Sequence, residues 1–172
     1  FTVSQNYAFT NQGSQNYIYI AIRRPHKPIE AGTDVFAVDT RTGSNPSFVS
    51  NFPVDMGWKR TIDASFSMNL ATRLTGSYYL LPSSSAGQTW DTGFVWDYMD
   101  GWAEDGGANS SVYSWMFKRA PGFFDVVNYV ATGGNTTNNV PHNLGVPPEM
   151  IIAKKRGAIS GWPVYHTATG LS

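Results

Sequence analysis

The chain has 172 residues with 12 basic and 12 acidic side chains, and only 14% of its residues are charged. This balance excludes the basic surface expected of a protein that binds nucleic acid or an anionic membrane. There is no cysteine, which excludes disulfides and thiolate metal sites, and no apolar run approaches the roughly 20 residues that span a bilayer. Abundant aromatic residues, glycines and prolines favour strands and turns over long helices.

Short runs of β-branched, aliphatic and aromatic residues predict strands along the chain. Strands buried on both faces are predicted at residues 17–22, 35–38, 123–130 and 150–153. Further strands are predicted at residues 77–81 and 92–96. Turns are predicted at residues 42–46, 82–87, 101–111 and 133–139. The expected fold is therefore all-β, with antiparallel β-sandwich or jelly-roll-like units in tandem and no substantial helix.

Four sequence signals recur in the same order at nearly one offset. The first is an aromatic-apolar run closed by basic residues and a proline, at residues 17–25 and 113–121, where Arg23 and Arg119 lie 96 apart. The second signal pairs residues 33–38 with residues 124–129. The third pairs residues 53–60 with residues 148–155 and includes Met56 and Met150, which lie 94 apart. The fourth pairs residues 75–76 with residues 169–170.

These recurrences predict a tandem array of β units. In this organisation residues 1–25 end a preceding unit, residues 26–119 form one complete unit and residues 120–172 begin the next. The chain starts at Phe1 rather than Met and stops within the pattern, so we expect a piece of a longer repeat protein. The alternative is that β sequences resemble one another simply because apolar and polar residues alternate in all of them.

The C-terminal part carries a set of motifs that can be interpreted as folding signals. His142-Asn143-Leu144-Gly145 predicts a turn, because Asn and Gly tolerate positive φ and two prolines follow. Residues 150–153 would then form a buried strand, and Trp162 and Tyr165 would cover the core from the next strand.

The same motifs are GFFDVVNY at residues 122–129, VPHNLGVPPEMIIAKKR at residues 140–156 and WPVYH at residues 162–166. Together they resemble an uncharacterised β-rich domain that recurs in structural proteins of marine tailed bacteriophages, often beside lectin-like domains. Val130-Ala131 replaces the glycine usual after the tyrosine. The resemblance covers about 50 residues strongly and residues 27–118 more loosely. It implies a virion component (tail fibre, tail-associated or particle-surface protein) without established catalytic residues.

Tryptophan and tyrosine side chains offer a candidate glycan-binding surface, since flat aromatic faces stack on sugar rings. The candidates are Trp90, Tyr98 and Trp102, and Trp102 is expected to be the most exposed ring because glycine and acidic residues flank it. The favoured alternative is that Phe94, Trp96 and Tyr98 alternate along one strand face and pack into the core.

Acidic residues cluster in the same region. Asp97, Asp100 and Asp105 are weak candidates for a cation site, although their spacing does not match an EF-hand loop. Together with Glu104 they are also the candidate acids of a glycan-cleaving enzyme, for which replacement of Asp100 or Glu104 would be the test. The alternative is that the four acids lie in a solvated loop, which suits solubility or a hydrated Ca²⁺ site better than catalysis.

The three histidines, His26, His142 and His166, lack the spacing of a metal motif, and His166 is expected to bond a local backbone group. Nucleophile and nucleotide-binding motifs are not found in the sequence.

The sequence therefore predicts a non-catalytic structural and interaction module that needs no cofactor. The resemblance implies that its partners are other virion proteins and copies of itself, with a host surface glycan as a further candidate, whereas the charge balance argues against nucleic acid or membrane. The location that the resemblance implies is the virion, assembled in the bacterial cytoplasm and exposed on the particle. Two other functions stay open: a carbohydrate-binding module and, less favoured, an enzyme that depolymerises host glycans.

Overall fold

The computed structural model describes residues 29–131, 137 and 139–171. Within them the chain is all-β with antiparallel sheets, as predicted, and its only helical element is a 3-10 turn, η1 (Gly32–Asp34). The eleven strands are β1 (Phe36–Arg41), β2 (Phe48–Val49), β3 (Met56–Thr61), β4 (Asn69–Thr72), β5 (Tyr78–Leu80), β6 (Thr89–Trp90), β7 (Gly101–Trp102), β8 (Asn109–Phe117), β9 (Met150–Ile152), β10 (Val164–His166) and β11 (Gly170–Leu171).

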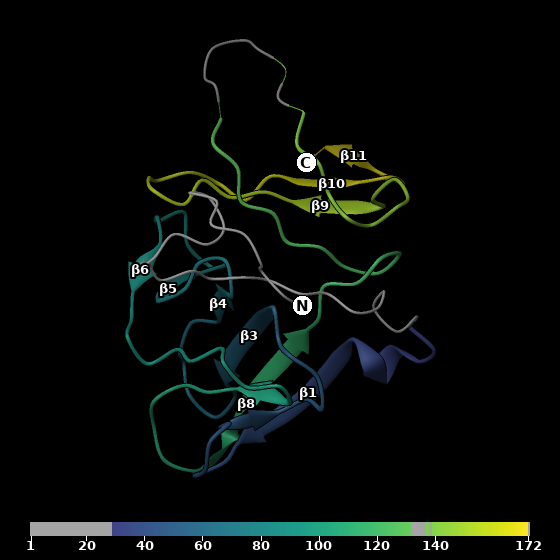
Figure 1. Cartoon of the computed structure of the whole chain (residues 1–172). Helices are drawn as coiled ribbons and strands as arrows, with labels where there is room; N and C mark the ends of the chain where they lie inside the picture. The colour runs from purple at the N-terminus through teal and green to yellow at the C-terminus, as the bar shows by residue number, and fades with distance from the viewer. Residues whose placement is uncertain (1–28, 132–136, 138, 172) are drawn as a thin grey trace, which may run out of the picture.

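The largest sheet has six strands in the order β1-β8-β3-β4-β5-β6. Its longest strand, β8, lies between β1 and β3, and buried and half-buried residues alternate along it from Val112 to Phe117. This alternation is the period-two pattern of a strand with one face toward a core. Figure 1 shows β1, β3 and β8 at one end of the molecule.

A two-stranded ribbon of β2 and β7 supplies the layer that packs on this sheet. Its Trp102 ring lies over Gly57 of β3, where an added Cβ would sit 3.0 Å from ring carbons. Glycine in mid-strand permits this close approach. The buried core cluster consists of Phe48, Phe52, Val54, Ala71, Phe94, Trp96, Trp102, Val112 and Met116.

A separate three-stranded sheet has the order β11-β10-β9 and lies at the opposite end from β1 and β8 (Figure 1). Hydrogen bonds join the loop after β5 to the loop between β9 and β10. The Gln88 N–H donates to the Arg156 carbonyl over 2.7 Å, and the Ser160 N–H donates to the Ser85 carbonyl over 2.9 Å. The Trp162 indole also donates to the carbonyl of Ser84. These bonds attach the small sheet to the larger unit.

The hairpins β3–β4 and β9–β10 have the same register at an offset of 94 residues. Met56 pairs with Thr72 in the first, and Met150 pairs with His166 in the second. In each hairpin one backbone bond closes the ladder, from Arg73 to Asp55 over 2.8 Å and from Thr167 to Glu149 over 2.9 Å. These four residues are also related by the offset of 94.

The turns that follow these hairpins are equivalent as well. The Thr75 N–H donates to the Thr72 carbonyl over 3.0 Å, and the Thr169 N–H donates to the His166 carbonyl over 3.1 Å. Each turn ends on a glycine at positive φ, Gly76 at 60° and Gly170 at 76°. The next strand then differs, because the pairing of β11 with β10 is shifted by two residues relative to that of β5 with β4.

Some predicted elements are wrong. Residues 123–130 form a turn and an irregular segment, with one isolated bridge between Ala120 and Phe124. Residues 92–96 contribute only a bridge at Val95, and residues 101–111, predicted as a turn, contain β7 and the start of β8.

The predicted burial of both strand faces is also wrong, since β1 has only half-buried and exposed residues and β9 is exposed along its length. The predicted strand at residues 17–22 lies outside the described residues.

Candidate functional site

Trp102, the ring predicted to be most exposed, is 0% exposed. It stacks on Trp96 with ring centroids 5.0 Å apart and on Phe48 at 5.3 Å. Its indole N–H donates to the Ser114 hydroxyl over 3.0 Å, which satisfies the one polar group that burial would otherwise leave unpaired. The prediction of a surface ring is therefore wrong, because Gly57 leaves room for the indole in the core and Gly101 lets β7 approach the Phe48 carbonyl and Pro46 closely.

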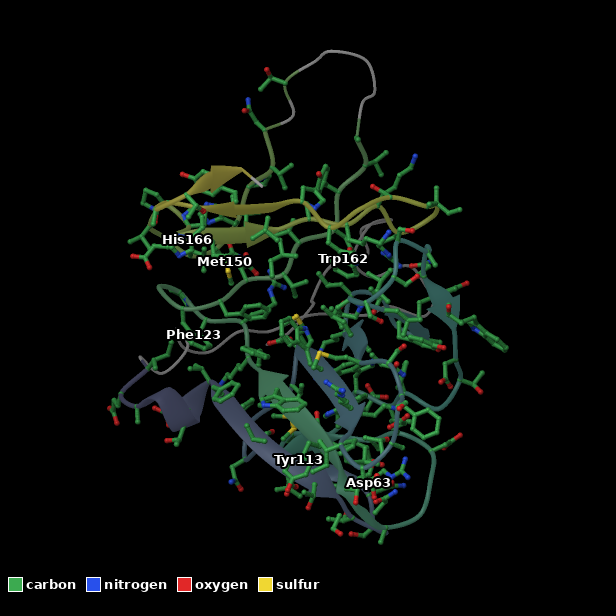
Figure 2. The ribbon with its side chains drawn as sticks, turned by 180° about the vertical axis from the view of Figure 1, so that it is seen from behind. Asp63, Tyr113, Phe123, Met150, Trp162 and His166 are labelled. Atoms are coloured by element: carbon green, nitrogen blue, oxygen red, sulfur yellow. The ribbon has the colours of Figure 1, made fainter. Side chains whose placement is uncertain are left out.

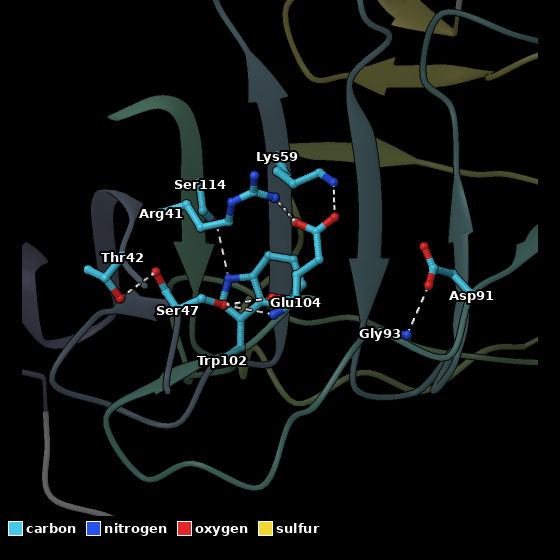
Figure 3. Close-up of polar contacts among 9 residues, drawn as sticks. All are labelled: Arg41, Thr42, Ser47, Lys59, Asp91, Gly93, Trp102, Glu104 and Ser114. Atoms are coloured by element: carbon cyan, nitrogen blue, oxygen red, sulfur yellow. Dashed lines mark hydrogen bonds and ion pairs between the residues drawn. The ribbon is translucent and has the colours of Figure 1, made fainter. Parts of the chain in front are cut away.

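Glu104, placed by the sequence in a solvated loop, points inward beside Trp102 (Figure 3). Its carboxylate forms an ion pair with Lys59 and lies 3.9 Å from the Arg41 guanidinium. Its backbone N–H bonds the Ser47 hydroxyl over 2.8 Å. One carboxylate oxygen of Glu104 and the Nε of Arg41 are buried without a hydrogen-bond partner. Glu104 thus holds the loop after β7 against the sheet through its ion pair with Lys59 and the bond of its backbone N–H to Ser47.

The three aspartates proposed as cation ligands do not form a metal site. Asp97, Asp100 and Asp105 are all exposed. Among the residues that the structure describes, no group of three or more histidines and carboxylates could hold a metal ion. The same part of the chain contains no helix of the length and apolar character needed to cross a membrane.

The other two glycan candidates have different surroundings. Trp90 lies on the outer strand β6 and is 64% exposed, so one ring is open to solvent. Tyr98 is half-buried. The described ring contacts of Trp102 are with the core rings of Phe48, Phe94 and Trp96, so the three candidates do not form one aromatic platform. The core positions predicted for Phe94 and Trp96 are confirmed.

A hollow that sequence reasoning missed lies on strands β3 to β5. Its volume is about 430 Å³, and its lining includes Lys59, Phe66, Asn69 and Tyr79. Phe66 is exposed and Tyr79 is half-buried, so the hollow combines aromatic rings with an amide and an ammonium group. No sequence motif marks it, since its residues come from three separate segments.

Asp125 organises the segment that contains the motifs at residues 122–129 and 140–156. Its carboxylate accepts hydrogen bonds from Arg119 Nε over 2.5 Å, from the Asn143 N–H over 2.7 Å and from the Val126 N–H over 2.9 Å. Burial alone would raise the pKa of Asp125, but the bond from Asn143 and the charge and hydrogen bond of Arg119 hold that pKa below its ordinary value. Asp125 therefore links the 122–129 motif to the turn at 142–145.

The histidines act as turn residues. The Nδ1 atom of His142 accepts the Leu144 N–H, and Gly145 has the predicted positive φ of 74°. The Nδ1 atom of His166 accepts the Ala168 N–H over 3.1 Å, which confirms the predicted local bond. Met150 and His166 face each other across β9 and β10 (Figure 2). His26 lies outside the described residues.

Comparison with known proteins identifies a family for the C-terminal half of the chain. Residues 82–171, 90 of the 172, match the model of a family described as a domain of unknown function, DUF7483. No curated protein and no solved structure matches the chain. The matched region begins at the loop that bonds the small sheet and ends in β11. The chain therefore belongs to the DUF7483 family.

Proposed function

We propose that the chain is a non-catalytic structural and interaction module of a bacteriophage particle, built from tandem sandwich-like β units with jelly-roll-like connections. The proposed units are residues 26–119 and 120–172, after the end of a preceding unit at residues 1–25. Its partners would be other virion proteins and copies of the same chain. The assignment to a phage particle rests on the resemblance of residues 122–166 to phage structural domains.

The observation that carries the repeat organisation is the common register of β3–β4 and β9–β10. The pairs Met56–Thr72 and Met150–His166 are related by one offset of 94 residues. The turn after each hairpin repeats the same backbone bond. A common propensity for β structure would not fix the same register, because pairing is set strand by strand by side-chain pattern and turn geometry. The family match of 90 residues is also close to this period.

The mechanism would be mechanical and multivalent. Units joined by hydrogen bonds would resist bending, and the bonds between Gln88 and Arg156 and between Ser85 and Ser160 support this proposal. Repeated units would present the same loops many times along a particle, so that weak contacts with neighbours or with a host surface gain avidity.

Mass spectrometry of purified native particles tests this proposal. We expect peptides of this chain in the particle fraction, in fixed ratio to known particle proteins and within a polypeptide that carries further copies of the 94-residue period. Peptides found only in the soluble fraction of infected cells, and never with particles, would contradict it.

Recognition of a host surface glycan is the second candidate, and the hollow on β3 to β5 favours it. Phe66, Tyr79 and Asn69 line it, and aromatic rings together with an amide are the combination of apolar and polar groups that sugars engage. A glycan array separates the candidates: binding lost in Phe66→Ala but kept in Trp90→Ala would support this hollow. If neither the natural protein nor the Trp90→Ala variant binds any glycan on the array, only the structural role keeps its support.

A further inference from the structure

The hollow on β3 to β5 lies on one face of three neighbouring strands. Each of these strands has a neighbour on both sides, since β3 lies between β8 and β4, β4 between β3 and β5, and β5 between β4 and β6. Lys59 pairs directly with Asn69 across β3 and β4, and it shares a strand face with Gly57, on which Trp102 packs. The floor of the hollow is therefore a continuation of the core face of the sheet and not an open strand edge.

Three polar side chains of the lining, Thr61, Ser67 and Asn69, are available to a ligand. None of them forms a side-chain hydrogen bond with any residue in the described part of the chain. They carry hydroxyl groups and an amide, which both donate and accept hydrogen bonds. The hollow thus has the donors and acceptors by which a binding site fixes the orientation of a hydroxyl-rich ligand.

Two aromatic residues and Leu81 complete the apolar part of the lining. The Tyr79 ring is held by the core, since it meets the Phe94 ring edge-on at 86° with the ring centroids 6.0 Å apart. Phe66 is 65% exposed, so contact with a ligand would remove apolar surface from water. The volume of about 430 Å³ falls within the range of small-molecule sites. A short glycan, with apolar ring surfaces and hydroxyl groups, therefore matches the lining.

Lys59 is the one charged residue among the described residues that line the hollow, and its charge is not fully balanced. Its ammonium group donates to the Glu104 carboxylate, and the other oxygen of that carboxylate lies 3.9 Å from Arg41 (Figure 3). No second carboxylate forms an ion pair with either cation within the part of the chain that the structure describes. Two cations therefore share one anion, which leaves one positive charge in excess. Because the side chains of Lys59 and Glu104 are only 15% and 9% exposed, salt screens this charge weakly.

We propose that the hollow binds an acidic glycan, whose carboxylate accepts a hydrogen bond from the Lys59 ammonium group. A lysine ammonium has three donors and Glu104 uses one of them, and a hydrogen bond between charged groups is stronger than one between neutral groups. Glu104 also holds Lys59 at the floor before the ligand arrives, which lowers the entropy cost of binding. The sugar hydroxyl groups would bond Asn69, Thr61 and Ser67. The inference rests on glycan recognition, the second candidate of the proposed function, and not on location in a phage particle.

Matched pairs of oligosaccharides test the inference, each pair differing only in that a uronic acid replaces the corresponding neutral hexose. Titration calorimetry at low salt should show the natural chain binding the acidic member roughly ten- to a hundredfold more tightly. Lys59→Gln is the test variant, because its amide can still donate to Glu104, and Arg41 remains as the counterion of that carboxylate. It should bind both members of a pair with similar affinity.

Arg60→Gln is the matched control. Arg60 follows Lys59 on β3, is exposed and belongs to the opposite face of the sheet, and its replacement changes the net charge of the chain by the same amount. It should keep the preference for the acidic member, and circular dichroism should show that both variants fold. Asn69→Ala locates the site independently of charge: it should weaken binding of both members roughly three- to tenfold and keep the preference.

Several results would overturn the inference. Equal affinity of the natural chain for both members, a preference kept in Lys59→Gln, or a preference lost in Arg60→Gln would each exclude the acidic ligand and leave glycan recognition in place. Unchanged binding in Asn69→Ala would place the glycan outside the hollow. No binding to any glycan, acidic or neutral, would end glycan recognition together with this inference.

Discussion

Replacement of Trp102 by alanine tests, through the free energy of unfolding, whether this ring lies in the core or on the surface. The indole is fully buried, stacks on Trp96 and Phe48, and donates a hydrogen bond to Ser114. Truncation of a buried tryptophan leaves a cavity and costs about 3–5 kcal/mol of unfolding free energy. Ser114 would also lose the partner of its buried hydroxyl. For a chain of this size the loss lowers Tm by about 6–20 °C.

Thermal and urea unfolding followed by circular dichroism measure this loss. The matched control is Trp90→Ala, because Trp90 is 64% exposed on an outer strand. Its unfolding free energy should stay within about 0.5 kcal/mol of that of the natural chain. Similar stability in Trp102→Ala and the natural chain would refute the burial argument, and glycan binding lost in that same variant would restore Trp102 as a surface ring.

Three further changes test the packing and electrostatics. Gly57→Ala places a methyl group 3.0 Å from the Trp102 ring and should lower the unfolding free energy by about 1–3 kcal/mol in urea unfolding, unless the ring moves freely. Glu104→Gln leaves the Lys59 charge uncompensated and should cost about 1–3 kcal/mol, between exposed and buried ion pairs, whereas an unchanged urea midpoint would show that the pair contributes nothing. Because the folded-state pKa of Asp125 is lowered, its contribution is present above the ordinary carboxyl pKa and is lost as pH falls through the folded pKa. Melting curves should therefore show Asp125→Asn less stable than the natural chain at pH 7 and the difference shrinking toward pH 3; a constant difference would contradict this assignment.

The parts of the fold that sequence predicts best are those with local causes. The apolar run at 150–153 and the runs at 35–38 and 77–81 correspond to β9, β1 and β5, with ends that differ by at most three residues. The turn at 142–145 follows from residues that tolerate positive φ.

Residues 123–130 have equally apolar sequence but form no strand. Asp125 lies within this run, and its carboxylate binds the backbone N–H groups of Val126 and Asn143. Side chains that bond the local backbone in this way compete with a sheet ladder. The long-range partner Asn143 could not be identified from the sequence alone.

The position of Trp102 depends on a contact that is distant in sequence. The glycine and acidic residues beside it in the sequence predict a solvent-exposed ring. The residues that bury the ring are Gly57, Phe48 and Trp96, which are distant in sequence or outside this flanking pattern. The glycine within the β3 sequence was the available signal, because glycine inside a strand marks close approach of another group. The inward position of Glu104 was missed for the same reason, since Lys59 lies 45 residues away.

Amide hydrogen exchange resolved by NMR is the most direct test of an incomplete second sheet. In dilute solution we predict slow exchange at the N–H groups of Met56 and Trp58, which face β8, and at Ile151, which bonds β10. The N–H groups of Met150 and Ile152 should exchange fast in the same sample, because the alternation of bonds in the β9–β10 ladder directs them away from β10. Slow exchange at Met150 and Ile152 in dilute monomer would contradict the account, because it would mean that the chain already covers the β9 edge by itself.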